Sequence, residues 1–358
     1  MAKKLKYSPK KNQPGLFDMT GDLFSQPSQP ADKLEEDIHE KMTDFVVNVA
    51  RQKEEEKRRE EEAEIARSIE LDRSRMDLSE GLLFISFGSG SSGNCSYVGS
   101  RRQGVLIDAG VDPDRIRQAM EANGLSMDCI KGICLTHDHG DHVRYVYSLV
   151  RRRQDVGIYC TPKTLNGMLR RHSLSRRIKD FHRPIYKEFP FKVAGLELTA
   201  FEVSHDGTDN SGYFITMGDR RFVIATDLGS ITDRVEYYMR QARFIVIESN
   251  YDAEMLRIGP YPMYLKSRIA AGNGHLDNAV TAEFLSRIYT PELKNVFLCH
   301  LSQENNTPEA ARQTVSEALL AAGVPSIGDG SGAIDMRDRA LQLYVLPRMT
   351  SSLLFALR

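Results

Sequence analysis

Residues 136–142 read Thr136-His137-Asp138-His139-Gly140-Asp141-His142 and follow an apolar run, residues 130–135, that predicts a buried strand. A strand cannot direct side chains at this spacing to one point, whereas the loop that leaves it can. Three imidazoles and a carboxylate within six residues suit zinc or a similar first-row metal. The alternative is a polar surface loop that happens to hold histidines, and the partners found downstream argue against it.

Further metal-ligand candidates lie at the ends of four other apolar runs. One such residue is usually a solvated turn residue. However, strands of one sheet end at one edge, so residues far apart in sequence can converge there. Together with the loop, the set favours a metal centre over unrelated turns; its members are Asp108, His205, Asp227 and His300.

Length and composition limit the class of protein. With 358 residues, 41% apolar and 27% charged, the chain can form one large core plus an extension. A net charge of −1 gives no general attraction to nucleic acid or anionic lipid, so such binding needs a local patch. The basic N-terminus lacks an apolar segment behind it, and the apolar runs are too short for a bilayer, so we expect no membrane association. Five scattered cysteines without a C-x-x-C pair favour the cytoplasm and argue against disulfides and structural zinc.

Composition changes near residue 80 and suggests four segments. Residues 1–30 are rich in Pro, Gln and Ser and are predicted to be a disordered tail. Residues 31–80 are predicted to be a charged helical extension with i,i+4 ion pairs. Residues 81–348 form the expected catalytic domain, and residues 349–358 a C-terminal tail. The extension lacks a sustained heptad but could form a homodimer through its apolar positions, Phe45, Val46, Val49, Ile65 and Ile69.

Short apolar runs and helical periods alternate in both halves of the catalytic domain. Strands are predicted near 82–87, 95–99, 104–108, 130–135, 157–160, 196–203, 212–217, 222–226, 243–248, 295–299 and 341–346. Helices are predicted near 113–122, 142–152, 162–170, 231–240, 277–288 and 308–321. This order favours the α/β (α+β) class: an αββα sandwich, two sheets face to face with helices outside, behind an N-terminal extension.

The ligand order Asp, His-x-His-x-Asp-His, His, Asp, His resembles that of the metallo-β-lactamase-fold hydrolases over about residues 82–346. Two flanking phrases, residues 86–94 (SFGSGSSGN) and 299–306 (CHLSQENN), resemble the YycJ (WalJ) branch. Members of that branch are regarded as 5′→3′ DNA exonucleases. The resemblance therefore implies a dinuclear metal-dependent phosphodiesterase that uses a metal-bridging hydroxide.

The family pattern, carried over residue by residue, assigns a ligand set. His137, His139 and His205 would hold one metal, Asp141, His142 and His300 the second, and Asp227 would bridge both. Two divalent ions roughly 3.5–4 Å apart lower the pKa of a shared water. Zinc or manganese is expected, with iron as an alternative, because mixed His/Asp ligation suits several ions. Asp108 is expected to orient a ligand loop by hydrogen bonding, and Asp138 to point away.

Two more groups are candidates for contact with substrate. His275 matches the place where tRNA 3′-processing endonucleases of this fold contact the scissile phosphate, so it joins Asp141 and Asp227 as a predicted catalytic residue. The alternative for His275 is a helix cap. A Gly/Ser loop could bind phosphate or could simply join two strands, and its candidate residues are Ser91, Ser92 and Asn94.

DNA is the expected substrate because of residues 143–187, called here the basic segment. It holds twelve Lys or Arg against two acids, with five aromatic residues interleaved. The alternative is a solvated face balanced by the acidic extension.

Only 48 positions separate Asp227 from His275, too few for the large domain that β-CASP RNA-processing relatives insert there. The competing function is a small-molecule hydrolase, a lactonase or a thioesterase of the glyoxalase II kind, which would need an apolar pocket. A non-catalytic interaction protein is disfavoured because every metal position is filled.

One peptide in the tail suggests a protein partner. Gln13-Pro-Gly-Leu16-Phe17 resembles the short peptides by which bacterial DNA enzymes bind the replication sliding clamp. Such pentapeptides also arise by chance in disordered tails. Sliding-clamp docking is therefore a hypothesis that a Leu16/Phe17 double alanine variant would test.

Overall fold

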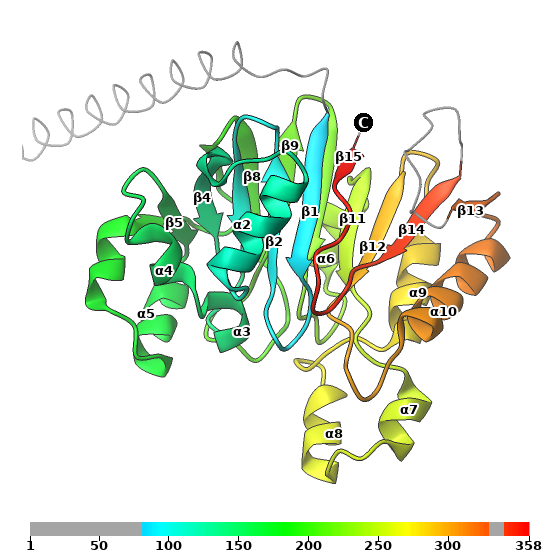
Figure 1. The fold of residues 1–358 in the computed structure, drawn as a ribbon. Helices are drawn as coiled ribbons and strands as arrows, with labels where there is room; N and C mark the ends of the chain where they lie inside the picture. Colours follow the sequence, from blue (N-terminus) through cyan, green and yellow to red (C-terminus); the bar gives the residue numbers. More distant parts are fainter. Residues whose placement is uncertain (1–80, 329–339, 358) are drawn as a thin grey trace, which may run out of the picture. The chain divides into compact units, whose positions relative to one another are not determined.

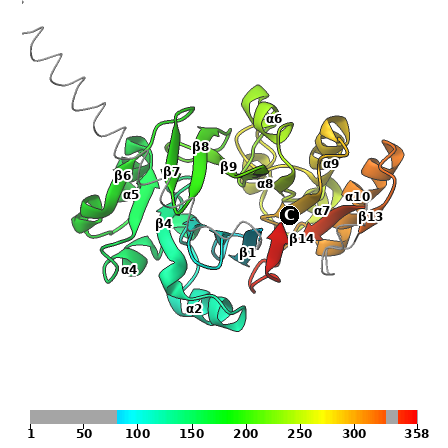
Figure 2. The ribbon, with the colours of Figure 1, turned by 90° about the horizontal axis from the view of Figure 1, so that it is seen from above.

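The computed structural model describes residues 81–328 and 340–357, which lie within one compact unit, Ala66–Arg358. The predictions for residues 1–80 fall outside the described residues: the disordered tail, the charged helix with its dimer contacts, and the Gln13–Phe17 peptide. Two sheets pack face to face, and helices cover the outer face of each (Figure 1, Figure 2). The predicted αββα sandwich is confirmed.

The first sheet has seven strands in the order β15-β1-β2-β3-β4-β5-β6. Its β15–β1–β2–β3 half is antiparallel, whereas β3, β4, β5 and β6 run parallel. Strands β3, β4 and β5 are short and buried apart from the partly exposed Lys131 and Tyr159, as expected for parallel strands. The strand bounds are β1 Leu82–Gly88, β2 Cys95–Gly99, β3 Gly104–Ile107, β4 Ile130–Cys134, β5 Gly157–Cys160, β6 His182–Pro184 and β15 Phe355–Leu357.

The second sheet has eight strands in the order β13-β14-β12-β11-β10-β9-β8-β7. Here β7 to β10 are antiparallel, and β10, β11, β12, β14 and β13 run parallel. Strand β8 alternates buried and more exposed residues over most of its length, which marks it as half-covered. The bounds are β7 Pro190–Val193, β8 Leu196–Glu202, β9 Ser211–Met217, β10 Arg220–Ala225, β11 Phe244–Glu248, β12 Asn295–Cys299, β13 Ile327–Gly328 and β14 Leu341–Val345.

The helices begin with clear sequence signals. Asp112, Thr161 and Thr307 each cap a helix whose first residue is proline, and each side chain accepts a backbone N–H bond from the first turn. The bounds are α2 Pro113–Ala122, α3 Gly140–Val143, α4 Val146–Val150, α5 Pro162–Arg171, α6 Asp233–Met239, α7 Ala253–Ile258, α8 Met263–Ile269, α9 Asn278–Ile288 and α10 Pro308–Ala321, with 3-10 turns at Met127–Cys129 and Arg176–Phe181.

Three apolar layers hold the sandwich together. The central layer joins the sheets around Phe84, whose ring centroid lies 5.2 Å from that of Phe222 and 4.9 Å from that of Phe297. A second layer packs α2, α4 and α5 on the first sheet, and a third packs α6, α9 and α10 on the second. Burial of this kind is worth roughly 25 cal/mol per Å² of apolar surface. The strands are thereby fixed, and so are the loops that leave them.

The parallel strands of both sheets end at the edge from which α7 and α8 project (Figure 1). Three non-glycine residues just beyond β3, β10 and β12 have left-handed backbone: Asp108 at φ 64°, Asp227 at φ 54° and His300 at φ 56°. This conformation costs a non-glycine residue roughly 1–2 kcal/mol. It turns the chain sharply after each strand, and all three residues are predicted site residues.

The structure corrects the predicted boundaries in several places. The predicted helix 142–152 is two short helices, α3 and α4, because the chain must turn to bring His142 inward. Residues 349–358 were expected to be a tail, but β15 pairs with β1, so the domain continues through Leu357. Strands β6, β7 and β13 and helices α7 and α8 were not predicted. Within residues 81–328 and 340–357, no helix is both long and apolar enough to cross a bilayer.

Candidate metal centre

All seven predicted metal ligands converge at the shared strand edge. His137, His139 and His205 form one group in which potential ligand atoms lie within 4.8 Å of one another. Asp141, His142 and His300 form a second group, and Asp227 belongs to a third with His137 and His142. The side chain of Asp227 also lies near the other ligands: its Oδ1 is 3.7 Å from His205 Nε2 and 3.5 Å from His300 Nδ1. It therefore occupies the position between the two groups.

Main-chain hydrogen bonds hold the loop of residues 136–142 in place. The backbone N–H of Asn94 donates to Asp141 O at 2.8 Å, and that of Ala109 donates to His142 O at 2.7 Å. A Cβ atom at Gly110 would lie 1.5 Å from Asp141 O, so only glycine permits this approach. The loop is thus fixed against two neighbouring segments by its backbone.

Four histidines each use one ring nitrogen inside the protein, which orients the other. His142 Nδ1 donates to Asp108 Oδ2 at 2.8 Å, and His300 Nδ1 donates to Glu248 Oε1 at 2.8 Å. His205 Nδ1 donates to Gly274 O at 3.0 Å, and His137 Nδ1 lies 2.9 Å from Thr136 Oγ1. Nε2 of His142 lies 2.9 Å from Asn94 Nδ2 and Nε2 of His205 lies 3.3 Å from His139 Nδ1, whereas Nε2 of His137 and of His300 is left for a ligand.

Some of the remaining polar atoms are buried without a partner. Among the described residues, His137 Nε2, His300 Nε2 and Asp227 Oδ2 make no hydrogen bond. Leaving such atoms unpaired costs roughly 1–3 kcal/mol each, unless a cation binds them. A donor set of imidazole nitrogens and carboxylate oxygens is what first-row divalent metals prefer. The residues present therefore fit divalent metal ions.

The surroundings lower the pKa of two histidines of the site and raise the pKa of two others. Burial, followed by the neighbouring His142, holds the pKa of His137 well below its usual value, and burial likewise lowers the pKa of His139. Burial opposes the charged form of His300 too, but Asp227, Asp141 and Glu248 outweigh it and raise its pKa to about 10. Carboxylates also raise the pKa of His142 against burial. The site is thus rich in negative charge, which favours cations.

Asp108 and Asp138 have different positions. Asp108 accepts hydrogen bonds from Thr136 N at 2.8 Å and from the His142 ring, so it holds the first and last residues of the loop of residues 136–142. Asp138 belongs to none of the candidate metal groups of the described residues. Its carboxylate accepts hydrogen bonds from Thr208 N at 2.9 Å and Thr208 Oγ1 at 2.6 Å, and so ties the metal loop to the segment after His205.

The three candidate residues of the Gly/Ser loop also differ in their burial. Asn94 is buried, and its Nδ2 donates to Gly90 O at 3.1 Å and to Asp141 Oδ2 at 3.2 Å. Its amide is thus hydrogen-bonded to Asp141 and also lies 2.9 Å from His142 Nε2, and its contact with substrate stays a prediction. Ser91 and Ser92 are exposed, and Ser91 lines a cavity beside the metal groups.

Glu248, which was not predicted, lies at the centre of the site. It is the last residue of β11 and is fully buried. Its Oε1 accepts hydrogen bonds from His275 Nδ1 and from His300 Nδ1, both at 2.8 Å, and its Oε2 accepts one from Leu228 N at 2.7 Å. Burial lowers the pKa of His275, but Glu248 outweighs that effect and raises it. The strand-end pattern that identified Asp227 applies equally to Glu248.

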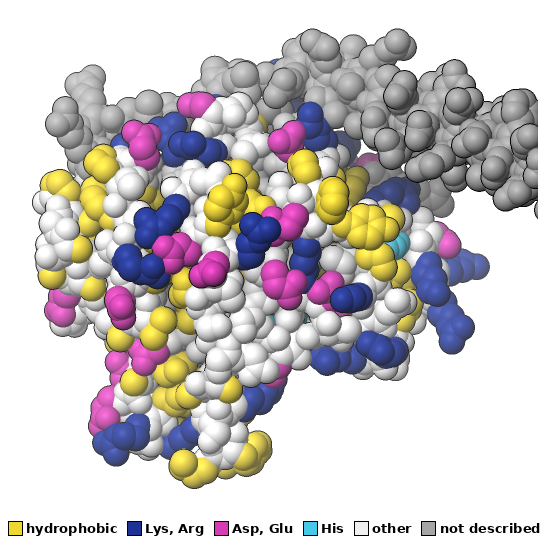
Figure 3. Space-filling model, turned by 180° about the vertical axis from the view of Figure 1, so that it is seen from behind, with side chains coloured by type: hydrophobic (Ala, Val, Ile, Leu, Met, Phe, Trp, Pro, Cys, Tyr) yellow, Lys and Arg dark blue, Asp and Glu magenta, His cyan; other side chains and the backbone are white. Residues whose placement is uncertain are grey.

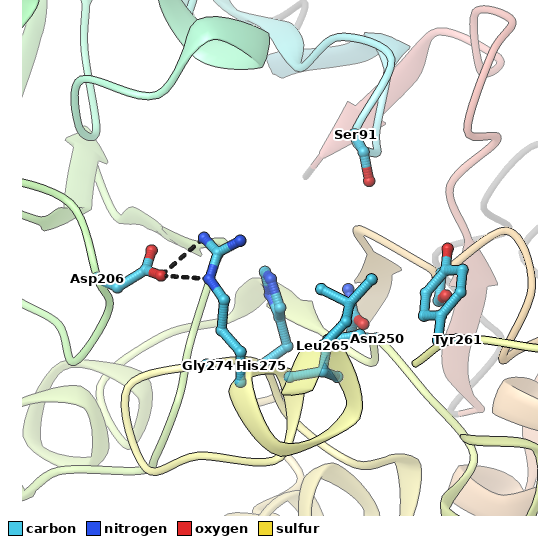
Figure 4. A pocket seen from close by; sticks show the side chains of 10 residues that line it. Ser91, Asp206, Asn250, Tyr261, Leu265, Gly274 and His275 are labelled. Atoms are coloured by element: carbon cyan, nitrogen blue, oxygen red, sulfur yellow. Dashed lines mark hydrogen bonds and ion pairs between the residues drawn. The ribbon is translucent and has the colours of Figure 1, made fainter. Parts of the chain in front are cut away.

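Asp206 is a second residue that the sequence interpretation missed. Its Oδ1 lies 3.4 Å from the Nε2 atoms of both His139 and His205 and has no hydrogen-bond partner among the described residues. Its Oδ2 accepts hydrogen bonds from Arg268 of α8 (Figure 4). The only sequence signal was its place directly after His205.

The basic segment extends from the metal loop along α4 and α5. Ten of its twelve Lys and Arg side chains are exposed, and they gather at one side of the view in Figure 3. Arg171 Nε lies 3.3 Å from Asp138 Oδ2, and His172 Nε2 donates to Asp138 O at 2.7 Å. The C-terminal end of α5 therefore touches the metal loop.

The aromatic residues of the basic segment mostly serve the core. Tyr159 stacks on Phe191 at 5.5 Å between ring centroids, and Tyr147 and Phe181 pack against the layer beneath the helices. Tyr186 is 60% exposed. The expected stacking surface for bases is accordingly much smaller than the sequence suggests, whereas the expected positive charge is present.

Comparisons with known proteins give the same family as the ligand pattern. Residues 103–300 match the β-lactamase superfamily domain. Exodeoxyribonuclease YycJ of Bacillus anthracis is 35% identical over 240 residues, 67% of this chain and 89% of that protein. Exodeoxyribonuclease WalJ of Streptococcus pneumoniae serotype 2 is 32% identical over 243 residues, 68% of this chain and 90% of that protein. The metallo-β-lactamase fold protein YhfI from Bacillus subtilis matches with a TM-score of 0.53 at 13% identity, over 76% of this chain and 99% of that one, which establishes the fold.

Proposed function

This chain belongs to the β-lactamase superfamily and, within it, to the family of the exodeoxyribonucleases YycJ and WalJ; on this premise we propose that it hydrolyses DNA from an end. It is a metal-dependent hydrolase. The observation that supports the proposal most directly is the convergence of four candidate metal groups, with unpaired ligand atoms, beside an exposed basic surface.

Two divalent ions would occupy the centre, zinc or manganese, with iron as an alternative. His137, His139 and His205 would hold one ion, Asp141, His142 and His300 the other, and Asp227 both. When bound, such a pair supplies an activated water at neutral pH and stabilises charge on phosphoryl oxygens. Asp108 and Glu248 would keep the His142 and His300 rings in the orientation that metal binding requires.

His275 would act on the leaving oxygen. Its Nδ1 is engaged by Glu248 at 2.8 Å, so Nε2 is the atom available to substrate. Burial disfavours the charged ring, but Glu248 outweighs that effect and raises the pKa of His275, which favours the form that can donate a proton from Nε2. Asp141 and Asp227 would contribute as metal ligands. Because His275 also belongs to a candidate metal group with Asp227, Glu248 and His300, metal analysis of a His275 variant must separate the two roles.

The basic segment would hold the DNA backbone. Arg170, Arg176, Arg177 and Lys179 are exposed, and their charged groups form no ion pair with another described residue. Such cations bind phosphates with an affinity that falls steeply as salt is added. Ser91, Ser92 and Asn94 remain candidates for contact with phosphate.

The experiment is to purify the protein with metal analysis and to assay end-labelled single- and double-stranded DNA alongside a lactone and a thioester. The proposal expects nucleotides to be released from the labelled end, DNA binding to weaken steeply with salt, and Asp227→Ala to be inactive. Salt-indifferent ester cleavage without phosphodiesterase activity would instead identify the small-molecule hydrolase. Opposite end labels decide between 5′→3′ and 3′→5′ digestion.

Three further proposals concern the cell and partners. A cytoplasmic location is supported by five free, buried cysteines and would be checked by fractionation. Sliding-clamp docking through Gln13, Leu16 and Phe17 rests on the sequence alone, and equal clamp binding by a Leu16/Phe17 double alanine variant would end it. A homodimer through the helix predicted from the sequence for residues 31–80 would be lost when that segment is removed, as measured by light scattering.

A further inference from the structure

A cavity of about 240 Å³ opens beside the metal groups, between the Ser91 loop and α8 (Figure 4). His275 and Asp206 form its inner side, and Tyr261, Leu265 and Arg268 form its outer side. This volume lies below the roughly 300–1,000 Å³ typical of small-molecule sites.

From this cavity we infer a subsite, resting on the proposed function, that holds the terminal nucleotide of a DNA strand, with Arg268 binding its terminal phosphate. The inner side carries His275, the residue proposed to act at the scissile bond. The last nucleotide of a strand cleaved there would lie in the cavity, and its terminal phosphate would reach Arg268, which lines the cavity as well. Such a contact would make cleavage depend on a strand end.

Arg268 has the chemistry for this contact. Its side chain is 60% exposed, and its Nε and Nη2 both bond to one oxygen of Asp206, at 2.8 Å and 2.7 Å. Guanidinium carries five N–H donors, so three remain for a phosphate. The other oxygen of Asp206 lies 3.4 Å from the Nε2 atoms of His139 and His205, which places Arg268 one carboxylate away from the metal ligands.

The outer side is rigidly joined to the catalytic elements. The backbone N–H of His275 donates to Ile269 O, at the end of α8, at 2.8 Å. A Cβ atom at Gly274 would lie 2.2 Å from that same oxygen, so glycine is required for this approach. Ser204 Oγ donates to Gly272 O at 2.8 Å. The backbone position of Arg268 relative to His275 and His205 is therefore set by the fold.

Tyr261 provides an aromatic surface for the base or sugar. It is half-buried and packs with Leu265 against Tyr251, Leu256 and Ile269, which form a small apolar cluster under α7 and α8. Aromatic side chains bind bases by stacking without sequence preference. The subsite would therefore accept any of the four terminal nucleotides.

The test uses full-length, metal-loaded protein and cleavage-resistant phosphorothioate oligonucleotides with a 5′-phosphate, a 3′-phosphate or neither. Wild type should bind one phosphorylated form about tenfold more tightly than the unphosphorylated form. Arg268→Ala should abolish this preference, and Arg268→Lys should keep part of it. On cleavable DNA, Arg268→Ala should raise KM with little change in kcat.

Arg257→Ala is the matched control, because Arg257 on the neighbouring α7 is 70% exposed and paired to Glu254 but does not line the cavity. Metal content is measured in every variant, since Asp206 loses its partner in Arg268→Ala. Equal binding of all three oligonucleotides by wild type, or equal behaviour of Arg268→Ala and Arg257→Ala, would overturn the subsite and leave the nuclease standing. Absence of cleavage with a retained phosphate preference would overturn the proposed function instead.

Discussion

The two sheets supply the two sides of the site in different ways. The first sheet contributes one loop, residues 136–142, that carries four candidate ligands and is fixed by main-chain bonds to Asn94 and Ala109. The second sheet contributes separate residues from separate strand ends, and Asp227 and His300 hold left-handed backbone there. Glu248 at the end of β11 joins His300 to His275.

This difference indicates that one side of the site binds DNA and the other carries the chemical step. The loop side continues into the basic segment, where exposed cations can hold a DNA backbone. The strand-end side carries Asp227 between the metal groups, the Glu248–His275 pair and the cavity. Variants on the second side should therefore change turnover, whereas variants in the basic segment should change affinity and its salt dependence.

The largest effect is expected from Asp227→Asn. Asparagine tolerates the left-handed backbone of this position, so the variant removes the charge without the strain that alanine would add. Loss of the carboxylate that lies between the two metal groups should lower kcat by about 10³-fold or more. Metal content, measured by mass spectrometry, should fall as well. Full metal content with normal turnover would show that Asp227 is not the shared ligand.

The next largest effect is expected from His275→Ala. If His275 donates a proton to the leaving oxygen, kcat should fall about 10²-fold, the lower end of general acid catalysis, while metal content stays at the wild-type level. The measurement is turnover beside metal analysis on the same sample. Metal loss in parallel with activity would move His275 into the ligand set, which the candidate group of Asp227, Glu248, His275 and His300 allows.

The sequence predicted most of the loop side because its signal is local. Four metal-ligating side chains within six residues indicate a metal site by themselves, and the apolar run before them predicts the strand that positions the loop. The strand-end residues required a second argument, that strand ends of one sheet meet at one edge. That argument found Asp227 and His300. It applies equally to Glu248, which ends the run Phe244–Glu248 and was not predicted.

Other features could not be predicted because they depend on tertiary contacts. Strand β15 has three residues and exists by pairing with β1, and β6 is equally short. Helices α7 and α8 are separated by Gly259, Pro260 and Pro262, which predict a loop from sequence. The aromatic residues of the basic segment look like a stacking surface in sequence, but Tyr159 is committed to Phe191. Whether an aromatic side chain can stack on a base depends on its burial, and burial is a property of the fold.

A smaller effect on turnover is expected from Glu248→Gln, together with a shift in pH dependence. Glu248 raises the pKa of His275, and a His acting as a proton donor is active below its pKa and inactive above it. Without the carboxylate the pKa of His275 falls, so the alkaline decline of kcat should move to lower pH, and the loss of kcat should be smaller than in His275→Ala.

The double variant Glu248→Gln/His275→Ala is the control for that shift. If Glu248 acts through His275, adding Glu248→Gln to His275→Ala should leave the pH profile of kcat unchanged. Because the buried Glu248 also accepts hydrogen bonds from Leu228 and His300, thermal stability and metal content must be measured in parallel. An unshifted alkaline limb in the single variant would remove Glu248 from the proton-transfer step.

The smallest effect on turnover is expected from variants of the basic segment. These variants test whether the loop side binds DNA without taking part in the chemical step. Arg170, Arg176 and Arg177 are exposed and lie at or beyond the end of α5. Replacing all three with Gln should leave kcat within about twofold and raise KM for DNA, because phosphate contacts add affinity without taking part in the chemical step. The slope of log affinity against log salt should become shallower by about 0.7–0.9 for each phosphate that no longer pairs with a cation.

The matched control replaces Arg117 and Arg257, exposed cations that are already paired to Asp114 and Glu254 outside this segment, and should leave the slope unchanged. An unchanged slope in the triple variant would mean that DNA approaches the metal groups along another surface, and the two sides of the site would then share binding as well as chemistry.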